Sequence, residues 1–246
     1  MELGFPAFAI LGFFAQMVDG AIGMAYGTIS TTFLISLGLL PAAASAAVHA
    51  AEVATTAVAG GSHAVAGNVD RRLVIPLALS GAMGGAIGAY LLTEAPVEYV
   101  KPAVALYLLL MGLVILRRAL HRPNEFRPAR RIVPLGLIGG FLDAIGGGGW
   151  GPIVTSTLLA RGHQPRRAVG SVILAEFFVS LAVAGTFVAT IGIDHWPVVL
   201  GLLAGGLLAA PLAAYIVRRV KPRTIMFAAA AAVILMSAKT LLLALA

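Results

Sequence analysis

The chain has 246 residues, of which 60% are hydrophobic and 11% charged, and its formal net charge is +7. Its mean hydropathy is +0.98, which is typical of a polytopic membrane protein and excludes a soluble enzyme. Because the chain has no cysteine, disulfides and thiolate metal sites are excluded as well. In such a protein we expect the Lys and Arg excess to mark cytoplasmic loops rather than a nucleic-acid partner.

Eight apolar stretches follow one another along the chain, and short polar segments separate them. Most are long enough to cross about 30 Å of hydrocarbon as a helix. One separating segment is longer: residues 117–131 contain six Arg residues and divide the chain nearly in half. The stretches are 4–36, 43–67, 73–93, 98–116, 132–160, 168–193, 197–217 and 224–246.

The two halves are copies of each other in register. A shift of 124 residues places Asp19 on Asp143 and Glu52 on Glu176, and it also aligns several glycines and prolines. Rare intramembrane acids would not pair by chance over such a length. We therefore predict one integral membrane domain, 1–246, the organisation common in secondary transporters. Its parts are the first repeat (1–116), the basic cytoplasmic linker (117–131) and the second repeat (132–246).

The distribution of basic residues predicts how the chain crosses the membrane. Fifteen of the 17 Lys and Arg residues lie in four segments, 71–72, 117–131, 161–167 and 218–223. All 15 fall on one side if the stretches 4–36 and 132–160 each enter and leave the membrane at the same face. By the positive-inside rule this side is cytoplasmic. The sequence thus predicts an all-α fold of two inverted-topology repeats, each with one re-entrant hairpin and three transmembrane helices.

The glycine run in the segment FLDAIGGGGWGP marks the tip of the second hairpin. Irregular backbone at membrane depth is tolerated only inside protein or beside water. The N-terminus of the returning half-helix can attract an anion, and glycines let a ligand approach the backbone. The first repeat offers hydroxyl groups at the equivalent tip. The predicted substrate-binding residues are Gly23, Tyr26, Gly27, Thr28, Ser30, Thr31, Gly146, Gly147, Gly148, Gly149, Trp150 and Gly151.

Four acids and one histidine within the apolar stretches are candidates for coupling or gating: Asp19, His49, Glu52, Asp143 and Glu176. Ionisable side chains in a bilayer are costly and usually functional. Glu52 and Glu176 could exchange a proton with water. Alternatively, they hydrogen-bond Ser, Thr or loop amides and lock the repeat interface, or they coordinate a cation. Asp19 and Asp143 could cap the amides of the tips, since each precedes its tip.

These motifs resemble the sulfite exporter TauE/SafE family, also called the toluene sulfonate uptake permease family. The resemblance covers nearly the whole chain and lies in VDGAIGMAYG and LDAIGGGGWGP, in the turns GLLP and GHQP, and in the helices carrying Glu52 and Glu176. It implies transport of sulfur-containing anions across the bacterial inner membrane. The first repeat departs from the family pattern, because Met24, Ala25 and Thr28 replace glycines and a proline.

We therefore expect a multi-pass secondary transporter of the inner membrane that exports a small sulfur-containing anion such as sulfite or an organosulfonate. A proton is the expected co-substrate, membrane lipid is a partner, and a homodimer is left open. Two alternatives are a cation or metal carrier that uses the four acids and a membrane scaffold or assembly factor. The sequence has no nucleotide-binding, zinc-protease or nucleophile motif, so we expect no enzyme activity, cofactor or metal site.

Overall fold

The computed structural model describes residues 4–120, 131–161, 163–216 and 222–245, and every regular element in these ranges is a helix. The prediction of an all-α polytopic membrane protein is confirmed. The elements are α1 (Phe5–Ile22), α2 (Tyr26–Ser36), α3 (Pro41–Val65), α4 (Arg71–Glu94), α5 (Val97–Leu120), α6 (Ile132–Gly146), the π-helical turn η1 (Gly151–Thr155), α7 (Ser156–Ala160), α8 (Pro165–Thr190), α9 (Trp196–Ile216) and α10 (Pro222–Leu245).

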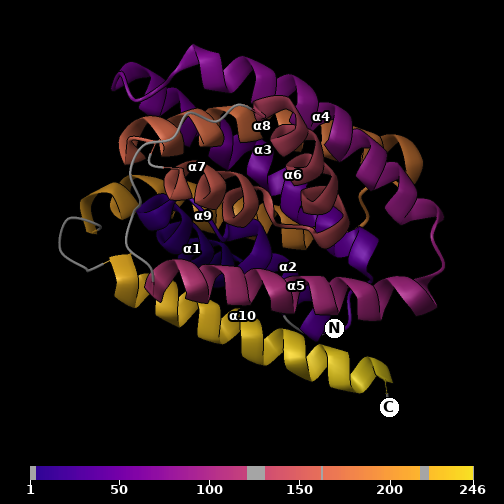
Figure 1. The fold of residues 1–246 in the computed structure, drawn as a ribbon. Helices are drawn as coiled ribbons and strands as arrows, with labels where there is room; N and C mark the ends of the chain where they lie inside the picture. The colour runs from indigo at the N-terminus through magenta and orange to yellow at the C-terminus, as the bar shows by residue number, and fades with distance from the viewer. Residues whose placement is uncertain (1–3, 121–130, 162, 217–221, 246) are drawn as a thin grey trace.

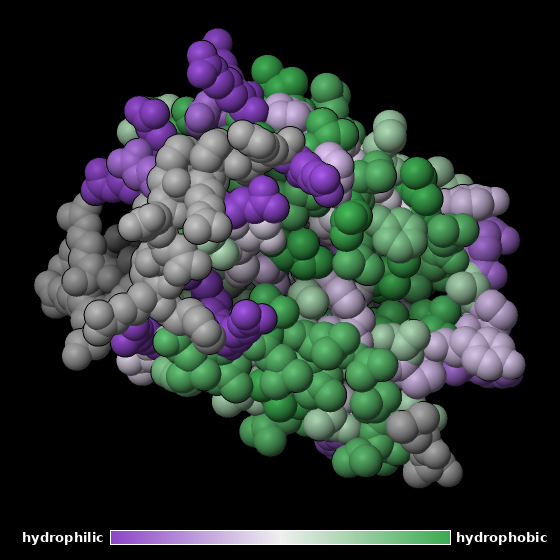
Figure 2. Space-filling view, in the orientation of Figure 1, coloured by the Kyte–Doolittle hydropathy of each residue, from purple (hydrophilic) through white to green (hydrophobic). Residues whose placement is uncertain are grey.

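The long helices have the length and surface of membrane spans. Within the described residues, five helices (α3, α4, α5, α8 and α10) are long and apolar enough to cross a bilayer, and α9 has 21 residues. Many outward-facing side chains are large and apolar: Leu79, Leu235 and Leu242 are 69%, 71% and 70% exposed. Figure 2 shows apolar side chains over the middle of one face, with hydrophilic ones mainly toward its two ends. This belt is suited to contact with lipid tails.

The same order of elements occurs in both halves. After a shift of 124 residues, α3, α4 and α5 coincide with α8, α9 and α10 to within a few residues, and α1 and α2 coincide with α6 and with η1 plus α7. The packing follows this correspondence, because α1 packs against α9 as α6 packs against α4. Figure 1 shows α5 and α10, themselves a corresponding pair, side by side. The orientation of the two halves in the membrane stays a prediction.

Glycines allow the helix pairs α4–α6 and α1–α9 to approach closely. A Cβ atom at Gly140 would lie 2.9 Å from the Cα atom of Gly81, and one at Gly205 would lie 2.6 Å from the backbone nitrogen of Phe13. Small residues at helix contacts are the usual means of close packing in membranes. Each of the helices α1 and α6 is therefore firmly attached to a long helix of the other half.

The helix connections gather at two ends of the molecule. At one end, the backbone N–H of Asp70 donates to Ser171 Oγ at 2.8 Å, so the α3–α4 connection meets the start of α8. Exposed Arg residues surround this contact, namely Arg71, Arg72, Arg166 and Arg167. We call this end the basic end. The α4–α5 and α8–α9 connections and the start of α3 lie together at the other end, which we call the opposite end. Residues 121–130 of the predicted linker and 217–221 lie outside the described residues.

Single cysteines test this arrangement, because the natural chain contains none. Gln164→Cys at the basic end should react with a membrane-impermeant maleimide only from the cytoplasmic side, and Glu98→Cys at the opposite end only from the other side. Both residues are exposed, so both variants should label equally in detergent. Labelling of Gln164→Cys from outside would rule out the re-entrant topology and the inverted repeat.

Candidate functional site

The two glycine-rich breaks between half-helices are buried and contact each other. We call residues 23–25, between α1 and α2, the first tip and residues 147–150, between α6 and η1, the second tip. The hydroxyl of Thr31 donates to the carbonyl of Gly147, and that of Thr155 donates to the carbonyl of Gly23 at 3.1 Å. These two hydrogen bonds are counterparts under the 124-residue shift. Each half therefore stabilises the tip of the other.

Glycine is needed where the two backbones touch. A Cβ atom at Gly27 would lie 2.8 Å from the Cα atom of Gly148 and 2.9 Å from Glu52 Oε1. A Cβ atom at Gly148 would overlap the backbone of Thr28. All 12 predicted binding residues are buried at this junction or in the half-helices that flank it. In this conformation the glycines accommodate protein backbone, so a ligand can reach them only if the tips separate.

Asp19 and Asp143 cap the half-helices that follow the tips. The backbone N–H of Tyr26 donates to Asp19 Oδ1 at 3.4 Å, and that of Trp150 donates to Asp143 Oδ1 at 2.8 Å. A carboxylate at a helix N-terminus satisfies an unpaired amide and interacts favourably with the helix dipole. The first amide of each returning half-helix, which we expected to face an anion, thus already has a partner.

Tyr26 and Trp150 anchor the tips to the long helices. The hydroxyl of Tyr26 donates to the carbonyl of Leu202 in α9 at 3.1 Å, and the indole N–H of Trp150 donates to the carbonyl of Val172 in α8 at 3.1 Å. Both aromatic side chains are buried. Because each aromatic residue stands directly at the start of a returning half-helix, these bonds fix where that half-helix begins.

His49 connects the acids of the two halves. Its Nε2 lies 3.2 Å from Asp143 Oδ2 and 4.0 Å from Glu52 Oε2. Its Nδ1 lies 2.9 Å from the carbonyl of Ser45, and the hydroxyl of Ser45 donates to the carbonyl of Ala144 at 2.7 Å. These contacts orient the ring so that one nitrogen faces both carboxylates. A proton between Nε2 and Oδ2 can reside on either group.

The polar environment differs between the two halves. The 124-residue shift places Ile173 at the position of His49, so Asp19 has no histidine opposite it. Instead, Asp19 borders a cavity of about 10 Å³, roughly the volume that one water molecule needs. Acids from both halves and several hydroxyls line it: Gln16, Asp19, Tyr26, Glu52, Thr55, Thr56, Ala59, Ile173 and Glu176. The cavity therefore lies beside the first tip, although the second tip has more glycines.

Tyr107 of α5 packs against the second tip and was missed by the sequence analysis. Its ring contacts Gly146, and its hydroxyl lies against Gly149. Under the shift it pairs with Ala231, so the repeat gives no signal for it. The buried hydroxyls of Tyr107, Thr28 and Ser30 have no hydrogen-bond partner among the described residues. Three donors near the junction are therefore available to a ligand.

The comparison with known families agrees with this architecture. The family model described as sulfite exporter TauE/SafE matches residues 8–240. The chain belongs to this family. It is also 41% identical over 248 residues to a Bacillus subtilis (strain 168) protein named "Probable membrane transporter protein YtnM", with coverage of 96% of this chain and 82% of that protein. No solved structure gives a significant match.

Family membership confirms several expectations from the sequence. TauE/SafE proteins are membrane transporters and not enzymes. With the apolar helices described above, the chain is thus a multi-pass transporter of the inner (plasma) membrane. The roles of the individual residues at the tips and in the acid cluster stay predictions.

The contact between the tips predicts opposite effects for two Gly→Ala substitutions. Gly27→Ala should lower the thermal stability of the purified protein, because overpacking against backbone costs about 1–3 kcal/mol. Gly185→Ala is the matched control: its Cβ would meet nothing within 4 Å, so it should gain up to about 1 kcal/mol of helix propensity. Melting in detergent measures both. Equal melting temperatures for the two variants would contradict the tight junction.

Proposed function

We propose that the protein is a secondary transporter that exports a small sulfur-containing anion, such as sulfite or an organosulfonate, and binds it where the two tips meet. The observation that carries this proposal is the buried junction itself, where the Tyr107 hydroxyl lies against Gly149 and the hydroxyls of Thr28, Ser30 and Tyr107 have no hydrogen-bond partner among the described residues. Hydroxyl groups are neutral hydrogen-bond donors, which suit an anion that must also be released. The family assignment supports a sulfur oxyanion or sulfonate as the substrate.

The symmetry of the junction supports two further parts of the proposal, the inverted repeat and the re-entrant hairpins. The reciprocal bonds of Thr31 and Thr155 relate one tip to the other as two copies facing each other. The half-helix α2 has 11 residues, and η1 and α7 have 5 residues each, so both returning half-helices are too short to cross about 30 Å of hydrocarbon. Such short elements can end inside the protein only where other elements satisfy their backbone groups.

The acid cluster supports coupling to protons. An anion at the tips would lie near Glu52, whose Oε1 is 2.9 Å from where a Gly27 side chain would begin. Two like charges so close together in a low-dielectric site are strongly unfavourable. Uptake of the anion together with a proton removes that repulsion. His49 lies within 4.0 Å of Glu52 and 3.2 Å of Asp143, so a proton can pass between these groups with small side-chain movements.

Glu176 is the acid through which the proton would exchange with water. It is partly exposed and lines the small cavity together with Asp19 and Glu52. A cation carrier would use the same carboxylates as ligands. Among the described residues, however, no group of three or more His, Asp or Glu is placed to hold a metal ion.

Flux assays in proteoliposomes test the proposal. Sulfite counterflow should respond to an imposed pH gradient, and Glu176→Gln should remove this response while exchange of sulfite for sulfite continues, because an amide cannot release a proton. Glu98→Gln, at an exposed position, is the control and should keep the response. If Glu176→Gln transports sulfite with unchanged pH dependence, the proton role is wrong. Uptake of a divalent cation without any anion flux would favour the cation carrier.

A further inference from the structure

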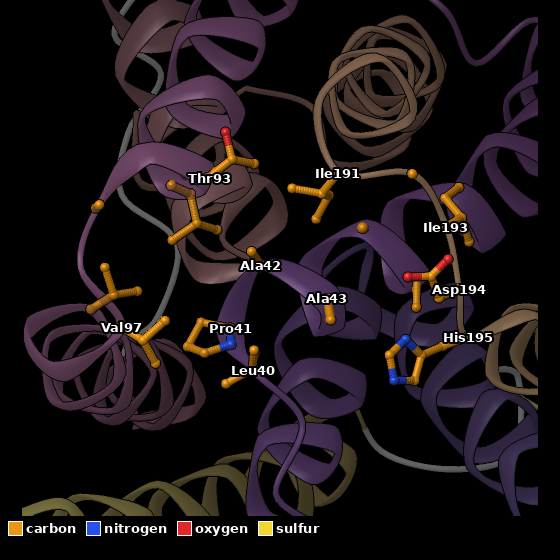
Figure 3. Close-up of a pocket in the computed structure, with 16 residues that line it drawn as sticks. Leu40, Pro41, Ala42, Ala43, Thr93, Val97, Ile191, Ile193, Asp194 and His195 are labelled. Carbon is orange, nitrogen blue, oxygen red and sulfur yellow. The ribbon is translucent and has the colours of Figure 1, made fainter.

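The opposite end of the molecule contains a cavity of about 310 Å³ that opens to the surface. Its walls come from the start of α3, the α4–α5 connection and segment 191–195 between α8 and α9 (Figure 3). Most of the lining is apolar, and Asp194 and His195 stand at one side. Ala46 and Ala47 of α3 also line it.

At the basic end the corresponding elements are in contact. The backbone N–H of Asp70 donates to Ser171 Oγ at 2.8 Å. A Cβ atom at Gly170 would lie 3.1 Å from the carbonyl carbon of Asn68. Gly170 and Ser171 are both buried. Segment 68–70 therefore lies directly on the start of α8 and closes this end.

The repeat relates this contact to the cavity. The 124-residue shift places Gly170 on Ala46, Ser171 on Ala47 and segment 68–70 on segment 192–194. The corresponding pairs of elements are thus in contact at the basic end and apart at the opposite end. A Cβ atom at Gly192 would meet nothing within 4 Å. Since Gly192 has no side chain, segment 192–194 has room to move onto Ala46 and Ala47.

We propose that segments 68–70 and 192–194 are the two gates of the transport path, and that the structure is the state with the basic gate closed and the opposite gate open. This inference depends on the transporter function proposed above. Ala46 lies three residues before His49 on α3, on the same face and about 4.5 Å away along the helix axis. The cavity thus extends to within one helical turn of the acid cluster.

The hydroxyl of Ser171 favours the state in which the basic gate is closed. Closure of the basic gate forms the hydrogen bond from Asp70 N–H to Ser171, whereas closure of the opposite gate would bring Asp194 N–H to Ala47, which has no acceptor side chain. A net hydrogen bond of ordinary strength shifts an equilibrium about fivefold. Ser171 and Ala47 therefore set the ratio of the two states.

Two cysteine reporters in the full-length chain measure this ratio in membrane vesicles. Ala43→Cys lines the open cavity and should react quickly with an impermeant maleimide from the non-cytoplasmic side. Ala168→Cys is buried one turn before Ser171 and should react slowly from the cytoplasmic side. Introduction of Ser171→Ala should raise the labelling rate of Ala168→Cys about fivefold.

Ala47→Ser is a second variant in the same assay, because it supplies an acceptor to Asp194 and should also raise labelling of Ala168→Cys. If Ser171→Ala does not fold, Ala47→Ser alone still tests the proposal. Thr240→Ala is the control: its hydroxyl donates to the carbonyl of Met236 within α10 at 3.0 Å, and α10 contributes no residue to either gate or to the lining of the cavity, so its loss should change nothing. Unchanged labelling in both gate variants, or a protected Ala43→Cys in the parent chain, would overturn the proposal.

Labelling requires no substrate, so the two proposals can fail separately. If the gate variants shift labelling but sulfite is not carried, the gates stand and the proposed substrate is wrong. If sulfite is carried and labelling does not shift, the proposed function stands and the gate assignment is wrong.

Discussion

Backbone that leaves the helical conformation inside a membrane protein must find its hydrogen-bond partners within the protein, and this requirement governs the centre of the molecule. The two tips supply partners to each other through Thr31 and Thr155. Asp19 and Asp143 satisfy the first amides of the half-helices that follow. Neither half could form its tip alone. The junction is therefore built from both halves of the chain, and the proposed ligand would contact both.

Sequence differences between the two halves make their otherwise similar structures unequal. The glycines and acids occur in both halves, but His49 is replaced by Ile173 and Ser171 by Ala47. The first difference places the histidine between Asp143 and Glu52 and leaves Asp19 at the small cavity. The second difference provides a hydrogen bond at one end only. A transporter with identical halves would have no preferred resting state, and the proposed gates differ between the halves at Ser171 and Ala47.

Much of the correspondence between the two halves could be predicted from the sequence, because rare residues mark the matching positions. The paired acids, the glycine runs and the 124-residue register identified both tips and the acid cluster. The individual side-chain contacts around the tips could not be predicted in this way. Tyr107 has no counterpart in the other half, so the repeat gives no signal for it. The bond between Ser45 and Ala144 joins residues 99 positions apart, a distance over which helical periodicity carries no information.

The tip contacts and the helix contacts differ in kind, and this difference indicates what can move. Glycine packing joins α1 to α9 and α6 to α4 along their lengths, with backbones too close to slide easily. The tips are in contact over a few residues only, through two hydroxyl-to-carbonyl bonds, each worth about 1 kcal/mol, and through the glycine contacts described above. Separation of the tips therefore breaks fewer contacts than separation of the helix pairs, and each tip can stay attached to its long helix. Since α9 follows segment 192–194 and packs against α1, and α4 follows segment 68–70 and packs against α6, the proposed movement of either gate would also displace the helix that leads to the tip of the other half. The proposed opening of the junction would leave intact the helix pairs that hold the protein together.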